Sequence, residues 1–143
     1  MNQQHATALR AARMKSTPKR LAILGILDAE PCYASPEELW QKLRGRFGTI
    51  GLPTVYRNLE ELAASGVICK VIHPNRQLYY YFCRNRGHHH HFVCLSCRRV
   101  EDVASCGIEA LEREMAEKSG CRVTSHIFQM NGLCASCADK EPE

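Results

Sequence analysis

The segment GLPTVYRNLEELAASGVI, residues 51–68, decides the fold of the first half of the chain. Its apolar residues Val55, Leu59 and Leu62 recur at i, i+4 and i+7, which is the spacing of one buried face of an α-helix. Gly66 follows them at the point where a glycine commonly ends a helix. The polar residues lie away from this apolar stripe, so the segment predicts an amphipathic helix whose outer face is free for a partner.

Helices are also expected before this segment, and a hairpin after it. The pair Thr17–Pro18 places an N-cap residue before a proline at the first helical position, and Ser35 and Glu38 have the spacing of a capping box. A short basic helix is expected over 3–13. Downstream, two apolar runs flank the turn Pro74–Asn75 and predict a β-hairpin. Three helices followed by a hairpin are typical of a winged helix-turn-helix, whose third helix enters the major groove of DNA.

Charge is distributed unevenly between the two halves. Residues 1–82 hold 11 Lys and Arg against 6 Asp and Glu, a net +5, whereas residues 83–143 hold 8 against 9, a net −1. A basic first half suits a polyanionic partner such as DNA. No apolar run approaches the roughly 20 residues that cross a bilayer, and the N-terminus lacks the features of a signal peptide. We therefore expect a cytoplasmic protein without membrane association.

The second half has a different pattern, which begins near residues 83–87. It predicts strands near 91–95, 98–103 and 121–130, a helix near 106–118 with Ile108, Leu111 and Met115 as its apolar stripe, and a small cysteine-bearing tail. The chain as a whole is therefore expected to be an α+β protein. A winged helix-turn-helix comes first, and a small α/β domain follows whose strand edges are natural places for dimer pairing.

Nine cysteines in 143 residues are more than an ordinary cytoplasmic protein contains. Without a secretion signal, metal binding or redox chemistry explains them better than a disulfide framework does. Two Cys-x-x-Cys pairs, Cys94/Cys97 and Cys134/Cys137, can close a tetrahedral shell of four thiolates around zinc with no open position. The sequence therefore predicts a structural zinc site.

These features together resemble the ferric uptake regulator family along nearly the whole chain. The matching segments are STPKRLAIL, LPTVYRNLEELAASGVI, HHHHFVCLSCRRVEDV and SHIFQMNGLCASC. The resemblance implies a winged-helix DNA-binding domain over 1–83, a hinge over 84–87, and a dimerisation and metal-binding domain over 88–143. It also implies a metal-dependent transcriptional repressor that binds double-stranded operator DNA as a homodimer and controls metal uptake genes. Neither an enzymatic activity nor a small-molecule substrate is expected.

The resemblance also implies which residues contact DNA. Tyr56 and Arg57 lie on the helix that reads the major groove, where Arg57 suits a bidentate contact to guanine and Tyr56 a contact to thymine. Lys15 matches a basic position that the family uses near the minor groove. Thr54 lies on the outer face of the same helix. Arg76, at the hairpin tip, is expected to contact a phosphate because of its position.

A run of four histidines, residues 88–91, leads into the first Cys-x-x-Cys. On a strand, successive side chains point to opposite faces, so one run can supply ligands to two metals. The resemblance implies that His89 and His91 belong to a regulatory site at the hinge. It implies an additional site with four ligands: His88, His90, Glu109 and His126.

Two positions favour zinc at the hinge site. Tyr33 stands where iron- and peroxide-sensing relatives place a histidine, and Cys83 stands where they place a carboxylate. Zinc-sensing relatives have a cysteine there, and a further ligand where this chain has Cys69. Thiolates favour zinc over iron(II), so the expected regulatory site comprises Cys69, Cys83, His89 and His91. Asp102 is the rival for one position, and iron(II) or manganese(II) is the alternative metal.

Other functions stay open at the level of the sequence. An iron- or peroxide-responsive repressor of the same family is one alternative. A thiol redox sensor would use accessible cysteines of low pKa beside a resolving partner, whereas a metallo-hydrolase would need an open zinc position and a general base. The remaining cysteines and histidines have no expected role in a site. We expect Cys32, Cys106 and Cys121 to be structural residues, and His5 and His73 to lie on the surface.

Overall fold

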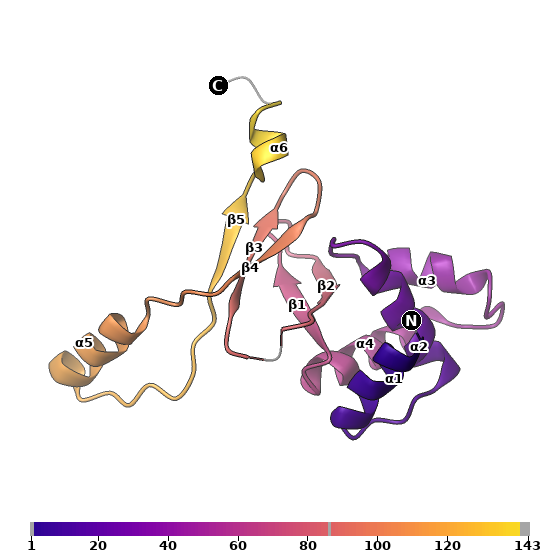
Figure 1. Ribbon diagram of the computed structural model, residues 1–143, viewed down its shortest axis with the longest axis horizontal. Helices are drawn as coiled ribbons and strands as arrows, with labels where there is room; N and C mark the ends of the chain where they lie inside the picture. The colour runs from indigo at the N-terminus through magenta and orange to yellow at the C-terminus, as the bar shows by residue number, and fades with distance from the viewer. Residues whose placement is uncertain (1, 86, 141–143) are drawn as a thin grey trace.

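Four helices and a β-hairpin form the first half of the chain (Figure 1). The computed structural model describes residues 2–85 and 87–140, so Arg86 of the expected hinge and the ends of the two expected domains, Met1 and 141–143, lie outside the described residues. The elements of this half are α1 (Asn2–Ala11), α2 (Pro18–Ala29), α3 (Pro36–Arg44), α4 (Leu52–Ala64), β1 (Ile68–Ile72) and β2 (Leu78–Phe82).

The starts of two helices follow from the local sequence. Thr17 Oγ1 accepts a hydrogen bond from the backbone N–H of Arg20 at 3.2 Å, and Pro18 begins α2. Ser35 and Glu38 form both bonds of a capping box at the start of α3, at 3.2 and 3.0 Å. Such caps satisfy backbone donors that no helical carbonyl can reach. The expected starts of α2 and α3 are therefore confirmed.

The core of this half holds α4 in place. Val55, Leu59 and Leu62 are each 0% exposed, which confirms the apolar stripe expected from the sequence. They pack in one cluster with residues from α1, α2, α3 and the hairpin, among them Leu9, Ile23, Leu24, Leu39, Leu43, Ile68 and Tyr80. Each fully buried side chain of this kind contributes about 1.5–3 kcal/mol. The core thereby fixes which face of α4 points outward.

The hairpin of β1 and β2 forms the wing. The two strands pair antiparallel along their full length. In the turn that joins them, Asn75 Oδ1 accepts a hydrogen bond from the backbone N–H of Gln77 at 2.9 Å, and Arg76 has a φ of 66°. The left-handed region is uncommon for a residue other than glycine, and the asparagine side chain supplies the local bond that stabilises this turn. Arg76 is thus exposed at the tip of the wing.

A three-stranded sheet forms the second half. Its strands are β3 (His90–Cys94), β4 (Val100–Val103) and β5 (Gln129–Gly132), in the order β4-β3-β5, with α5 (Glu109–Ser119) between β4 and β5 in the chain and α6 (Ala135–Ala138) at the end. β4 runs antiparallel to β3, whereas β5 runs parallel to it. Because parallel strands end at the same edge of a sheet, the segments after β3 and β5 emerge together. The architecture is α+β, as expected.

Residues 104–128, which carry α5, project from the sheet as an arm (Figure 1). None of the described residues of α5 is buried, and Leu111 and Met115, which were expected to be buried, are 59% and 46% exposed. The strand expected over 121–130 is shorter, because only β5 pairs with the sheet and residues 121–128 run along the arm. Both expectations are wrong for the single chain, since the arm extends away from the sheet that would cover it.

The loop between α2 and α3 joins the two halves. The backbone N–H of Val100 donates to the Pro31 carbonyl at 3.0 Å, and that of Tyr33 donates to the Arg98 carbonyl at 3.1 Å. Tyr33 itself is 2% exposed and belongs to a small second core, which also contains Val71, Tyr79, Val93 and Val100. The loop therefore continues the sheet of the second half while it packs against the wing.

His5, assigned to the surface from the sequence, is 2% exposed, so that assignment is wrong. Its Nε2 lies 2.9 Å from Asp28 Oδ2, and its ring packs edge-on against Phe82. Arg84, from the expected hinge, pairs with the same carboxylate. Burial raises the pKa of Asp28, but the hydrogen bonds from His5 and Arg84 outweigh it and lower the pKa. His5 is buried because this partner, far away in the sequence, satisfies its Nε2.

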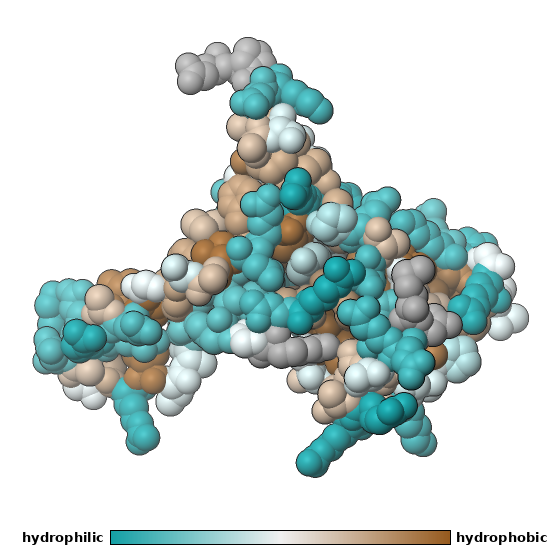
Figure 2. Space-filling model, in the orientation of Figure 1, coloured by the Kyte–Doolittle hydropathy of each residue, from teal (hydrophilic) through white to brown (hydrophobic). Residues whose placement is uncertain are grey.

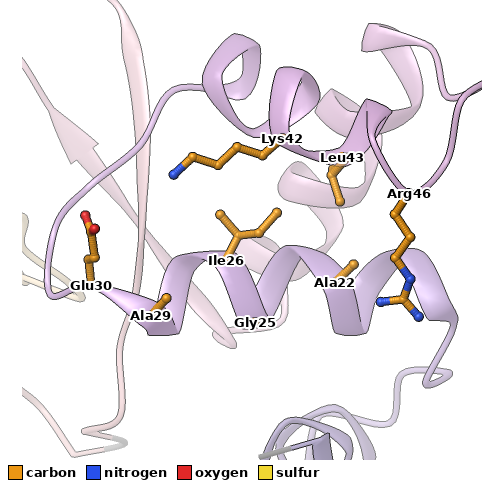
Figure 3. Close-up of a pocket in the computed structure, with 8 residues that line it drawn as sticks. All are labelled: Ala22, Gly25, Ile26, Ala29, Glu30, Lys42, Leu43 and Arg46. Atoms are coloured by element: carbon orange, nitrogen blue, oxygen red, sulfur yellow. The ribbon is translucent and has the colours of Figure 1, made fainter.

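A hollow of about 450 Å³ lies between α2 and α3 (Figure 3). Its lining consists of Ala22, Gly25, Ile26, Ala29, Glu30, Lys42, Leu43 and Arg46. The long side chain of Lys42 extends along the hollow above an apolar floor that α2 provides. None of these lining residues is one of the metal ligands or DNA contacts expected from the sequence, so the candidate sites lie elsewhere.

Candidate metal centres and nucleic-acid interface

Four cysteines meet beyond the carboxyl ends of β3 and β5: Cys94, Cys97, Cys134 and Cys137. Their sulfur atoms all lie within 4.8 Å of one another, and the Sγ atoms of Cys97 and Cys134 are 3.7 Å apart. A tetrahedral zinc with Zn–S bonds of about 2.3 Å requires sulfur separations of about 3.8 Å. The arrangement therefore fits a closed four-thiolate zinc site, and the parallel pairing of β3 with β5 is what brings the two Cys-x-x-Cys segments together.

The backbone around Cys94 favours its thiolate form. Burial raises the pKa of Cys94, but the backbone N–H groups of Cys134 and Cys97, which point at its sulfur at 3.4 and 3.5 Å, lower the pKa to about 6. The next residue in this turn, Arg98, has a φ of 71° and donates its N–H to the Cys94 carbonyl at 3.1 Å. Because the thiolate is the form that binds metal, this turn prepares Cys94 as a ligand.

A second cluster lies where the wing meets the sheet. Cys83 follows β2 directly, and its Sγ lies 2.8 Å from His89 Nε2 and 3.7 Å from His91 Nε2. The two Nε2 atoms are 3.1 Å apart. Asp102 is the partner of His91 across the β3–β4 pair, and its Oδ1 lies 3.5 Å from His91 Nε2. The structure thus brings Cys83, His89, His91 and Asp102 into one donor group.

Cys69, on β1, lies beside this group. Its thiol hydrogen-bonds the thiol of Cys83, and this bond is the largest of the causes that lower the pKa of Cys83 to about 4. A hydrogen bond from His91 acts in the same direction, whereas burial of Cys83 opposes both. Asp102 therefore belongs to the donor group itself, whereas Cys69 is linked to the group through Cys83.

His89 is held in an orientation that suits metal binding. Its Nδ1 lies 2.7 Å from the Gly87 carbonyl oxygen, which can only accept, so Nδ1 carries the proton. Nε2, on the side of Cys83, is then the nitrogen that can bind metal. Histidines that bind metals usually donate their other ring N–H in this way. The backbone bond thus fixes the ring and the tautomer before any metal arrives.

A third cluster lies at the base of the arm. Cys106 Sγ lies 3.1 Å from His90 Nε2, 3.2 Å from His126 Nε2 and 3.4 Å from His88 Nε2. His126 Nε2 is in turn 3.1 Å from His90 Nε2 and 3.2 Å from His88 Nε2. The expected ligand Glu109 is exposed at the start of α5 and does not belong to this group. Cys106, expected to be a structural cysteine outside any site, takes its place in the group.

The sequence contained only a weak signal for this cluster. The alternation of the histidine run separates His88 and His90 from His89 and His91, as the two donor groups require. Cys106 was one of several unassigned cysteines, and a turn at Gly107, with a φ of 65°, separates it from α5. That turn, rather than a recognisable spacing, decides which residue of this segment meets the histidines.

Basic residues gather at the outer face of α4. One hollow there is lined by Lys15, Lys19, Arg20, Thr54 and Arg57, among others, and a second is lined by Glu37, Tyr56 and Arg76, among others. Tyr56 donates its hydroxyl hydrogen to Glu37 Oε1 at 2.6 Å. The residues expected at DNA therefore border two hollows that both include α4, the helix expected to enter the major groove.

A winged helix with a basic outer face, joined to a small sheet that carries clusters of metal donors, defines a metal-responsive regulator of transcription. The model of the ferric uptake regulator family matches residues 11–131, and the chain belongs to that family. The ferric uptake regulation protein of Escherichia coli K12 is 34% identical over 96% of this chain and 93% of its own length. The zinc uptake regulation protein of Mycobacterium tuberculosis H37Rv is 36% identical over 89% of this chain and 97% of its own.

Solved structures of the family share the fold. A zinc uptake regulator complexed with zinc and DNA superposes with a TM-score of 0.79 at 26% identity, over 97% of this chain and 93% of that one. The ferric uptake regulator of Vibrio cholerae superposes with a TM-score of 0.61 at 33% identity, over 90% and 98%. Family members are regulators of transcription, not enzymes. No helix among the described residues has the length and apolarity needed to span a bilayer.

Proposed function

We propose that the chain is a zinc-responsive transcriptional repressor that binds operator DNA as a homodimer in the cytoplasm and controls metal uptake genes. The observation that carries this proposal is the cysteine at the junction of wing and sheet. Cys83 Sγ lies 2.8 Å from His89 Nε2, and the pKa of Cys83 is lowered to about 4. A shell of thiolate and imidazole donors favours zinc over harder divalent ions. One relative is a zinc uptake regulation protein, which points the same way.

The regulatory zinc would be bound by Cys69, Cys83, His89 and His91. The Asp102 carboxylate lies within 4.8 Å of the donor atoms of Cys83, His89 and His91, and its side chain is 41% exposed. Cys69 is preferred because its thiol interacts with Cys83 and because a second thiolate suits zinc. Asp102 nevertheless favours a second candidate. A carboxylate in place of Cys69 would suit iron(II) or manganese(II) better, and the protein would then respond to iron or manganese.

Zinc at this site would couple metal to DNA by fixing the relative position of the two halves. Two of its ligands belong to the wing and two to the start of the sheet. Without metal, the arrangement that binds DNA is only one of several that are populated, and the apparent DNA affinity falls by that fraction. The similarity to a structure with zinc and DNA, over 97% of this chain, supports the view that the present arrangement is the one that binds DNA.

DNA binding would use α4 and the wing. Arg57 would contact a guanine and Tyr56 a thymine in the major groove. Thr54 and Lys15, which line the same hollow as Arg57, would contact the backbone and the adjacent minor groove. Arg76, exposed at the wing tip, would contact a phosphate. A dimer would then present two such helices to successive major-groove faces.

The homodimer is supported by apolar surface in the second half. Several large apolar side chains of the arm and of β5 are exposed in the single chain: Leu111, Met115, Val123, Ile127, Phe128 and Met130. Figure 2 shows apolar surface on the arm and along β5. β5 is an edge strand of its sheet, and an unpaired edge is a natural place for a second copy to pair. The four-cysteine cluster next to it would hold a structural zinc, which contributes folding free energy directly.

The test is DNA binding as a function of buffered free metal. Protein with zinc retained in the four-cysteine site is titrated with zinc, iron(II), manganese(II) or nickel(II), and binding of operator DNA is measured at each free concentration. Zinc should activate at a far lower free concentration than iron(II). Activation by iron(II) at lower free concentrations than zinc would instead establish the iron-responsive alternative, and DNA binding independent of every metal would overturn both.

A further inference from the structure

The cluster at the base of the arm has a donor set of its own. Its four donor atoms are the Nε2 nitrogens of His88, His90 and His126 and the sulfur of Cys106. The sulfur lies 3.1–3.4 Å from the three nitrogens, and His126 Nε2 lies 3.1–3.2 Å from the other two nitrogens. A tetrahedral zinc with Zn–N bonds of about 2.05 Å and a Zn–S bond of about 2.3 Å requires separations of about 3.3–3.6 Å. The cluster therefore matches a closed tetrahedral shell to within a few tenths of an ångström.

We propose that Cys106, not Glu109, is the fourth ligand of the additional metal site, and that this site therefore selects zinc or a similarly thiophilic divalent ion. One thiolate among three imidazoles makes the shell softer than the three-imidazole, one-carboxylate shell that Glu109 would give, and soft donors disfavour iron(II) and manganese(II). The proposal does not depend on which metal occupies the hinge site, because the two sites share no ligand.

Contacts behind the ligands support this assignment. His126 Nδ1 lies 3.0 Å from Glu112 Oε1, so the carboxylate accepts the Nδ1 proton and leaves Nε2 free to bind metal. The His90 ring packs edge-on against the ring of Phe128, with centroids 5.3 Å apart. A carboxylate behind a histidine fixes its ring and raises its basicity as a ligand. Glu112 is thus a positioning residue, and α5 contributes to the site through Glu112 rather than through Glu109.

The position of the site gives it a structural consequence. Cys106 and His126 stand near the two ends of the arm, residues 104–128, whereas His90 begins β3 and His88 lies two residues before it. α5, between them, has no buried residue. A metal bound by all four would join both ends of the arm to the sheet and close the loop that carries α5. Loading of the site should therefore order the arm, together with the apolar surface that the dimer is proposed to use.

The test uses cobalt(II), whose bond to a thiolate gives a charge-transfer absorption that imidazole and carboxylate ligands lack. The background variant is Cys69→Ser with Cys83→Ser, in which the hinge holds no thiolate, and zinc is retained in the four-cysteine site. Cobalt(II) should then give a thiolate band that saturates at one site per chain. Adding Cys106→Ser should abolish this band, and the matched control Glu109→Gln should leave its intensity and the cobalt affinity unchanged.

Two further measurements use the chain without the hinge substitutions. Cys106→Ser should lower zinc affinity at one site, and Glu112→Gln should lower it by about 10–100-fold. Backbone hydrogen exchange in residues 104–128 should slow on zinc addition in wild type and in Glu109→Gln, but not in Cys106→Ser.

A missing band in the background variant, or an effect of Glu109→Gln with none of Cys106→Ser, would overturn the proposal. Zinc-dependent DNA binding by Cys106→Ser reports on the hinge separately, so failure here is distinguishable from failure of the proposed function.

Discussion

Arg98 and Glu38 form an ion pair, 2.5 Å between Nη1 and Oε1, that joins the turn after Cys94 and Cys97 to the start of α3. Glu38 is also the capping-box residue of that helix. Arg98 holds its place in the left-handed region, with a φ of 71°, which costs of order 1–3 kcal/mol for a residue other than glycine. The side chain that reaches Glu38 thus comes from the turn that carries Cys94 and Cys97. The ion pair therefore connects the half that carries the donor clusters directly to the winged-helix half.

We predict that Arg98→Ala loosens the two halves. An exposed ion pair contributes about 0.2–1 kcal/mol, so operator affinity at saturating zinc should fall by a few-fold while zinc content stays unchanged. The neighbouring Arg99→Ala is the matched control, because its ion pair with Glu101 lies within the second half. Equal effects of the two substitutions on DNA binding, measured by fluorescence anisotropy, would contradict the role assigned to Arg98.

The same pair gives a pH dependence. Burial raises the pKa of Glu38, but the hydrogen bonds from Arg98 and Ser35 outweigh it and lower the pKa below the ordinary value of 4.5. A carboxyl group with a lowered folded-state pKa stabilises the fold above its unfolded-state pKa, and this contribution is lost as the pH falls through the folded-state pKa. In the wild type, acid unfolding should therefore include a contribution below the usual carboxyl range that Glu38→Gln removes. Acid unfolding of Glu38→Gln identical to that of the wild type would contradict this role of Glu38.

The four-cysteine cluster should be essential for stability. Cys94→Ser or Cys137→Ser removes one ligand from a closed shell, so each variant should lose one tightly bound zinc per chain and should unfold at lower temperature or become monomeric. Cys121→Ser is the control, since Cys121 is exposed and outside every donor group. Zinc content, sedimentation and thermal unfolding measure the three effects. A Cys94→Ser protein that stays folded, dimeric and fully metallated would show that the cluster is not a structural zinc site.

Arg57 should determine specificity at one base. Arg57→Ala should weaken operator binding by about 1–3 kcal/mol and relax discrimination at one guanine in each half-site. Zinc binding should be unaffected, because Arg57 is exposed on the outer face of α4 and belongs to none of the donor groups among the described residues. Arg113→Ala, on the exposed α5, is a control for loss of one positive charge. Should both variants bind operator as tightly as wild type, the assignment of α4 as the recognition helix is wrong.

Local patterns predicted the first half well, for a physical reason. The stripe of α4 and the caps of α2 and α3 depend on residues within a few positions of one another. The arm was predicted less well, because Leu111 and Met115 have the spacing of a buried face but none of the described elements of the same chain covers them. Cys106 could not be predicted as a ligand from the sequence, because the turn at Gly107, and not a sequence spacing, brings it to the histidines. His5 needed a partner far along the chain.

The last prediction concerns the hinge. Cys83→Ser should abolish zinc-dependent DNA binding while the structural zinc and the dimer stay intact, because Cys83 contacts His89, His91 and Cys69 and so joins the wing to the histidines. Cys121→Ser is again the control. Since coupling between two sites is reciprocal, operator DNA should tighten hinge zinc in wild type by the factor by which zinc tightens DNA, and neither effect should remain in Cys83→Ser. Paired titrations, zinc with and without DNA and DNA with and without zinc, measure both factors. Unequal factors in wild type, or equal coupling in wild type and Cys83→Ser, would exclude the hinge cluster as the site through which zinc controls DNA binding.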